Sequence, residues 1–170
     1  AGGYDIFISK LDITGKFVWA KRIGAASDDY GYSIAVDQVG QVYTTGAFAG
    51  TVDFNPGSTV NNLTSTGYSD VFISKLNSSG GFVSAEHIGG TDYDYGFSIA
   101  LDELRNIYTT GAYLGTGDFD PGGGTANLNS NGYYDIFVSK LCSPPFPPGA
   151  VSGPVIVCAG STKTYFISAV

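Results

Sequence analysis

Short runs of large, mostly uncharged residues recur along the chain, separated by turns rich in Gly, Asp and Asn. Their length, their β-branched and aromatic content and their alternation of large with small residues predict strands. The first four predicted strands are 5–11, 16–23, 31–37 and 41–48. Short Gly-containing turns at 12–15 and 38–40 join them pairwise into hairpins. No segment sustains an apolar period of 3.6, so we expect almost no helix.

This strand pattern repeats with a period of 65 residues. Residues 2–66 align on 67–131 without a gap, and the strand at 5–11 returns nearly unchanged at 70–76 and 135–141. The chain therefore contains two full repeats, 2–66 and 67–131, and the start of a third at 132–141.

Both faces of the predicted strands are largely uncharged, whereas a sheet with one wet face alternates apolar with charged residues. Four-stranded antiparallel blades, one for each repeat and each covered on both sides by its neighbours, satisfy this pattern. The sequence thus predicts an all-β protein built of β-propeller blades. A β-solenoid is the main alternative, but its period is usually shorter and it lacks hairpin turns.

The repeated segments Tyr30–Asp37, Tyr43–Ala47 and Asp5–Leu11, together with 15–20, resemble the bacterial β-propeller repeat of the SBBP type. The resemblance covers residues 1–141. It implies a secreted or cell-surface protein, with export by the type IX system as one route, and it carries no catalytic residues over.

The composition changes after Leu141. Residues 142–154 are rich in Pro and read as a stiff linker. Residues 155–170 read as two strands and resemble the opening of the Ig-like and PKD-like modules of large bacterial surface proteins. Three states of Cys158 are open: a disulfide bond with Cys142, a disulfide bond with a cysteine outside this sequence, or a free buried thiol.

Charge and composition narrow the function classes. Eight basic against fifteen acidic residues give a net charge of −7, which disfavours nucleic-acid binding. With 43% hydrophobic and 14% aromatic residues the chain is too apolar for a disordered tail. It has no apolar run of the ~20 residues that a membrane-spanning helix needs. Because it opens on Ala1 without Met, we expect a processed product or a piece of a longer protein.

Two loops carry oxygen side chains at alternate positions before a Pro-Gly turn. They place Asp53 and Asn55 in the first repeat and Asp118 and Asp120 in the second. Calcium prefers several such ligands on a loop, but the third ligand and the distal Glu of an EF-hand are missing. Asx-turns, in which the side chain bonds its own backbone, are the favoured interpretation, and calcium is the alternative.

Aromatic side chains near the starts of strands predict a patch for glycans or protein partners. Its members are Trp19, Tyr30, Tyr32, Tyr93, Tyr95, Tyr133 and Tyr134. Packing between blades is the competing interpretation of Trp19. His87 is the single histidine and aligns with Arg22, so no catalytic triad or metal set is expected around it. Acids that flank strands recur once per repeat, which argues against a catalytic site because such a site needs particular groups at one place.

We therefore expect a non-catalytic extracellular scaffold, adhesion or protein-interaction module of a bacterial secreted or surface protein. Its partner would be a protein, a glycan or other copies of the chain. A calcium-stabilised or glycan-binding propeller and a subunit of a surface filament are alternatives, and a propeller hydrolase or lyase is less favoured.

Overall fold

The computed structural model describes residues 2–142, and in that range it contains thirteen strands and no helix. The strands are β1 (Ile6–Leu11), β2 (Phe17–Ile23), β3 (Tyr30–Val36), β4 (Val42–Phe48), β5 (Thr51–Asp53), β6 (Asn62–Thr64), β7 (Asp70–Leu76), β8 (Phe82–Gly90), β9 (Asp94–Leu101), β10 (Ile107–Tyr113), β11 (Thr116–Asp118), β12 (Asn127–Asn129) and β13 (Asp135–Leu141). The all-β antiparallel class predicted from the sequence is confirmed.

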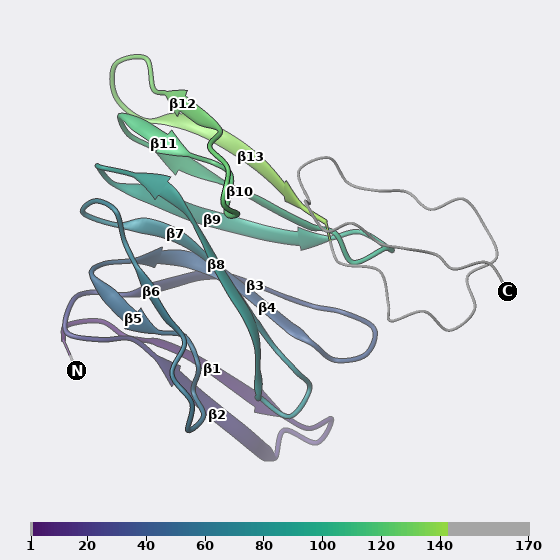
Figure 1. Cartoon of the computed structure of the whole chain (residues 1–170). Coiled ribbons are helices and arrows are strands. Elements are labelled where there is room, and N and C mark those ends of the chain that lie inside the picture. The colour runs from purple at the N-terminus through teal and green to yellow at the C-terminus, as the bar shows by residue number, and fades with distance from the viewer. Residues whose placement is uncertain (1, 143–170) are drawn as a thin grey trace, which may run out of the picture.

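Three blade-like sheets lie one behind another (Figure 1). The central blade contains β3, β4, β7 and β8, in that order, with every neighbouring pair antiparallel. On one side of it lies the β1–β2 hairpin, and on the other side lies the sheet β13–β10–β9.

The strands of one 65-residue repeat are divided between two blades, whereas the sequence suggested that each repeat makes its own sheet. The predicted hairpins are correct, but β4 pairs along its whole length with β7 of the next repeat, from Val42 opposite Leu76 to Phe48 opposite Asp70. Main-chain hydrogen bonds between two strands far apart in the sequence do not alter the residue pattern of either strand. The sequence pattern therefore predicts the hairpins but not which hairpins join in one sheet.

A short extra hairpin in each repeat was also missed by the sequence analysis. It contains β5 and β6 in the first repeat and β11 and β12 in the second. In the second repeat β11 extends the central blade by pairing with the end of β8, at Gly89 and Gly90. Three-residue strands are too short to show a period, and Gly and Asn weaken their strand signal.

A β-bulge interrupts β3 of the central blade and β9 of the last sheet at the same point of the repeat. The register of β3 on β4 shifts between Gly31 and Ser33, so Tyr32 is the extra residue. In β9 the shift falls next to Gly96, and Phe97 takes the place of Tyr32. Bulges redirect side chains, and here each one carries an aromatic residue.

Apolar side chains fill the layers between blades. One cluster joins Ile6 and Ile8 of β1 to Phe72 of β7, and two others join the opposite face of β7 to the last sheet through Phe137 and Ile99. The central blade is thus covered on both faces, as the uncharged strands predicted.

The predicted linker beyond Cys142, the Ig-like segment 155–170 and Cys158 lie outside the described residues, and so does the proposed Cys142–Cys158 pairing. Within 2–142, the structure contains no helix of the length and apolarity required to cross a membrane.

Candidate functional site

Aromatic rings gather at one end of the blades, which we call the band end. There β1, β3, β7, β9 and β13 begin and β4 and β8 end; it is the left end in Figure 1, toward which the arrow of β8 points. Nine rings make one connected set, the aromatic band: Tyr4, Tyr30, Tyr32, Tyr68, Tyr93, Tyr95, Phe97, Tyr133 and Tyr134.

Most neighbouring rings on one strand stack nearly parallel. Tyr30 and Tyr32 of β3 have centroids 5.9 Å apart and planes 3° apart, and Tyr95 and Phe97 of β9 have centroids 5.9 Å apart and planes 4° apart. Tyr32 meets Phe97 at 5.8 Å, which joins the rings of the central blade to those of the last sheet. The bulged residues of the two strands therefore make the bridge between blades.

The band contains the tyrosines of the patch expected from the sequence, but not Trp19. The six tyrosines of that prediction lie together in it, whereas Trp19 lies apart, on β2. The indole is half-buried against the core, and its Nε1 donates to the carbonyl oxygen of Ser78 at 3.2 Å. Trp19 thus fits the packing interpretation rather than the patch.

The sequence prediction of the patch omitted three members of the band: Tyr4, Tyr68 and Phe97. The repeat alignment contained a signal for each of them, since Phe97 aligns with Tyr32, Tyr4 with Tyr134 and Tyr68 with Tyr133. In the first repeat, however, Tyr68 and Tyr133 align with Gly3, so the first repeat alone gave no indication of Tyr68.

Three phenols of the band, those of Tyr30, Tyr32 and Tyr134, have a raised pKa. Burial raises the pKa of Tyr32, and burial together with the hydrogen bond to Tyr95 raises the pKa of Tyr134 to about 12. Burial and the neighbouring Asp28 also raise the pKa of Tyr30. The hydroxyl groups are therefore available as hydrogen-bond donors and acceptors.

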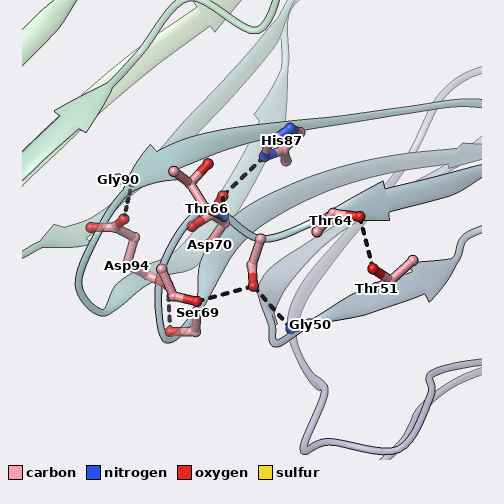
Figure 2. A network of polar contacts seen from close by, with 11 residues as sticks. Gly50, Thr51, Thr64, Thr66, Ser69, Asp70, His87, Gly90 and Asp94 are labelled. Atoms are coloured by element: carbon pink, nitrogen blue, oxygen red, sulfur yellow. Dashed lines mark hydrogen bonds and ion pairs between the residues drawn. The ribbon is translucent and has the colours of Figure 1, made fainter.

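Buried carboxylates hold the loops that support the band. Asp94 accepts from the Gly90 amide at 2.6 Å (Figure 2). It also accepts from the Leu114 amide at 3.3 Å. In the first repeat Asp29 accepts in the same way from the amides of Ala25 and Ala49. Asp94 thus ties the start of β9 to the ends of β8 and β10. Asp29 likewise ties the start of β3 to the ends of β2 and β4.

Burial is the main cause of the altered acidity of these two groups. It raises the pKa of Asp94 to about 6, and the carboxylates of Asp70 and Asp92 add to that effect. Burial also raises the pKa of Asp29. The two repeats therefore place a carboxylate with weakened acidity at the same structural position.

His87 and Arg22 occupy equivalent positions beside equivalent acids. Nδ1 of His87 lies 3.0 Å from Oδ2 of Asp70, which also accepts from the Thr66 amide (Figure 2). Arg22 donates to Asp5 at 2.8 Å. Since the same contact occurs in both repeats with a different side chain, it acts as a structural tether, as the alignment of His87 with Arg22 indicated.

The loops proposed for calcium use their side chains in Asx-turns. Oδ1 of Asp53 accepts from the amides of Asn55 and Asn61, and Oδ1 of Asn55 accepts from the Gly57 amide. The second repeat has the same arrangement. Oδ1 of Asp118 accepts from the amides of Asp120 and Ala126, and Oδ1 of Asp120 accepts from the Gly122 amide.

Each of these loops lines a polar, solvent-open hollow beside the preceding outer strand. The first is next to Arg22 and the second next to His87. Across residues 2–142, no three His, Cys, Asp or Glu side chains converge as metal ligands would. Calcium binding by these loops stays a prediction of the sequence.

The acids that recur after strands cap turns. Oδ1 of Asp37 accepts from the amides of Val39 and Gln41, and Oδ1 of Asp102 accepts from the Asn106 amide. The side-chain hydrogen bond from Asn106 is the main reason that the pKa of Asp102 lies below its usual value. The same role in both repeats agrees with the structural interpretation of these residues.

Comparison with known proteins agrees with this geometry. The family model described as a beta-propeller repeat, SBBP, matches residues 18–47 and 85–112. A protein of Acanthamoeba polyphaga mimivirus, named as an uncharacterized WD repeat-containing protein, is 26% identical over 110 residues. That match covers 56% of this chain and 8% of the relative. By its repeated sequence and its antiparallel blades, the chain is similar to proteins built of β-propeller repeats.

Proposed function

We propose that this chain is a non-catalytic protein-interaction module of an extracellular or cell-surface protein. Its propeller repeats and its relative named for WD repeats support an interaction role. The acidic, Gly- and Tyr-rich composition supports the extracellular assignment.

The aromatic band is the observation that carries the proposal. Tyr4, Tyr32, Tyr68, Phe97 and Tyr133 expose large parts of their rings to solvent in one connected surface. Tyr provides a large, rigid and amphipathic contact area at a low cost in conformational entropy, and it is enriched in the centres of protein interfaces. Contiguous exposed aromatic surface of this kind marks binding sites.

A binding screen tests the proposal. The chain is immobilised and probed with purified secreted and surface proteins and with an array of glycans. A band variant, Tyr68→Ser with Tyr93→Ser, is probed in parallel. A control variant, Phe17→Ser with Leu104→Ser, removes exposed apolar side chains from the opposite end of the blades. We expect protein ligands that bind the wild type and the control but not the band variant. Ligands retained by the band variant, or turnover of a substrate, would contradict the proposal.

A second candidate is assembly of copies of this chain through the open faces of the two outer sheets. Phe7 on β1 and Ile136 and Val138 on β13 are exposed, although the equivalent residues of the central blade are buried. Contact between these different faces would be heterologous and would produce a ring or a filament. Sedimentation of the wild type and of Ile136→Asp tests it: assembly should grow with concentration only in the wild type. A monomer at all concentrations rejects it.

A further inference from the structure

The two ends of the blades differ in net charge, although Asp12, Asp37, Asp102 and Glu103 place acids at the end opposite the band as well. Seven carboxylates lie at the band end, next to strand starts: Asp5, Asp28, Asp29, Asp70, Asp92, Asp94 and Asp135. Among the described residues, Arg22 is the Lys or Arg that lies at the band end, near the end of β2. Its guanidinium group is paired with the carboxylate of Asp5 at 2.8 Å. The band end is therefore strongly acidic.

The opposite end carries most of the described cations, close to strand ends and turns: Lys10, Lys16, Lys75, Arg105 and Lys140. Several are engaged within the chain. Lys10 donates to the Ser78 carbonyl at 2.9 Å, and Arg105 lies 3.7 Å from Asp37. Lys21, within β2, extends toward that end as well, since its Cε lies 2.9 Å from the position of a Cβ on Gly80.

Two of the band-end acids adjoin the rings. Asp28 is exposed; its carboxylate accepts from the Tyr4 amide at 2.9 Å and from the Tyr30 hydroxyl at 3.2 Å. Asp92 directly precedes Tyr93 and is half-buried; its main-chain carbonyl oxygen accepts from the Tyr68 amide, and its carboxylate lies beside Gly115. The aromatic band thus has a negative group beside its first-repeat part and another beside its second-repeat part.

The stacking of the rings weighs against a sugar as the ligand. A sugar packs its apolar face onto a free aromatic face, but the nearly parallel neighbours Tyr30–Tyr32 and Tyr95–Phe97 cover part of one another. What the band offers is ring edges, hydroxyl groups and carboxylates. This combination suits a peptide with long aliphatic side chains that end in positive charges.

We propose that the band end binds a basic protein segment, rich in Lys and Arg, which lies across the aromatic band between Asp28 and Asp92. The aliphatic stems contact the rings, and the charged groups pair with the carboxylates. The field of the acidic end accelerates association, so binding weakens as salt screens it. This inference rests on the proposed interaction function and specifies the class of partner.

Fluorescence anisotropy on the full chain tests the inference. The probes are labelled decapeptides that alternate Gly with Lys, Arg or Glu, and cellohexaose and chitohexaose serve as competitors. We expect the Lys and Arg peptides to bind, the Glu peptide to fail and the sugars not to compete. Binding of the Lys peptide should weaken by about tenfold when the salt concentration rises from low to physiological.

Matched variants separate a defined site from general attraction to an acidic protein. Asp28→Asn with Asp92→Asn removes two charges at the band end. Glu86→Gln with Glu103→Gln removes two exposed charges elsewhere. The first pair should weaken binding about tenfold and the second less than about twofold. Equal losses for the two pairs would overturn the inference.

Removing the rings provides the second arm. Tyr68→Ser with Tyr93→Ser should weaken the Lys peptide about tenfold, whereas Tyr68→Phe with Tyr93→Phe should retain most of the binding; circular dichroism confirms that each variant is folded. If the band binds a neutral or acidic protein or a sugar instead, the inference fails while an interaction role for the band stands. If no band variant alters any binding, both proposals fail.

Discussion

One seven-residue sequence occurs three times in this chain and has three different environments. Its aromatic residue is Phe7 in β1, Phe72 in β7 and Phe137 in β13. Phe7 is 77% exposed, Phe72 is 0% exposed and Phe137 is 4% exposed. Since the local sequence is nearly the same, the neighbouring blade decides the burial.

The aliphatic residues on the other face show the reverse order. Ile6 in β1 is 3% exposed and Val71 in β7 is 1% exposed, but Ile136 in β13 is 84% exposed. The first sheet is therefore covered on the side of its aliphatic residues, the last sheet on the side of its Phe, and the central blade on both. A single repeat cannot bury both faces of its own strands; each blade depends on its two neighbours.

The largest expected effect is on stability, and it comes from truncating the aromatic residue of the repeated strand. Phe72→Ala should lower the free energy of unfolding by about 3–5 kcal/mol, because it opens a cavity between two blades. Phe7→Ala should change it by less than about 0.5 kcal/mol, because that ring is largely in solvent. Urea unfolding of the two variants measures both. Similar losses for Phe7 and Phe72 would mean that the blades do not stack as described.

The second prediction concerns the close contact of inner strands within a blade. A Cβ on Gly46 would overlap the carbonyl oxygen of Tyr30 and lie 2.8 Å from the Phe72 ring. Gly46→Ala should therefore cost about 3 kcal/mol in unfolding free energy. The control is Gly123→Ala, where nothing lies within 4 Å of the added carbon, and it should cost almost nothing. Thermal unfolding compares them, and equal melting temperatures would refute the contact.

The third prediction tests whether the buried carboxylates of Asp94 and Asp29 have the same effect on the pH dependence of stability. The folded-state pKa of Asp94 is about 6 against an ordinary value of 3.8, so between these pH values the folded chain holds a proton that the unfolded chain releases. The contribution of Asp94 to stability is thus greatest below pH 4 and is lost as pH rises through 6, by about 2 kcal/mol.

Asp94→Asn should remove that decrease. The difference in unfolding free energy between variant and wild type should therefore change from about pH 4 to about pH 7, through the folded-state pKa of Asp94, and be constant above that range. Asp29→Asn should change in the same direction, since burial raises the pKa of Asp29 as well. Urea unfolding at several pH values provides the measurement. A difference that is independent of pH for both variants would contradict the shared role.

The smallest expected effect concerns the two outer loops. Because Asp53 and Asp118 already accept two backbone amides each, we expect the melting temperature to be the same in calcium and in EDTA. Differential scanning calorimetry makes the comparison. An increase of several degrees with calcium would establish the calcium-stabilised alternative, and its loss in Asp118→Asn would locate the site.

The sequence predicted the features that depend on local pattern or on exact repetition. These are the hairpins of β1–β2 and β3–β4, the uncharged faces and the Asx-turns after Asp53 and Asp118. It did not predict the pairing of β4 with β7, because edge hydrogen bonds do not depend on side-chain identity. Nor did it predict that Tyr32 meets Phe97 while Trp19 lies apart, because these contacts depend on how two blades are placed.

Amide hydrogen exchange of the intact chain tests the dependence of each blade on its neighbours most directly. If blades protect one another, the slowest exchange should occur in β4 and β7, whose strands are paired on both edges and covered on both faces, and β1, β2 and β13 should exchange faster. Equal protection in β1, β7 and β13, or the slowest exchange in an outer sheet, would contradict the account.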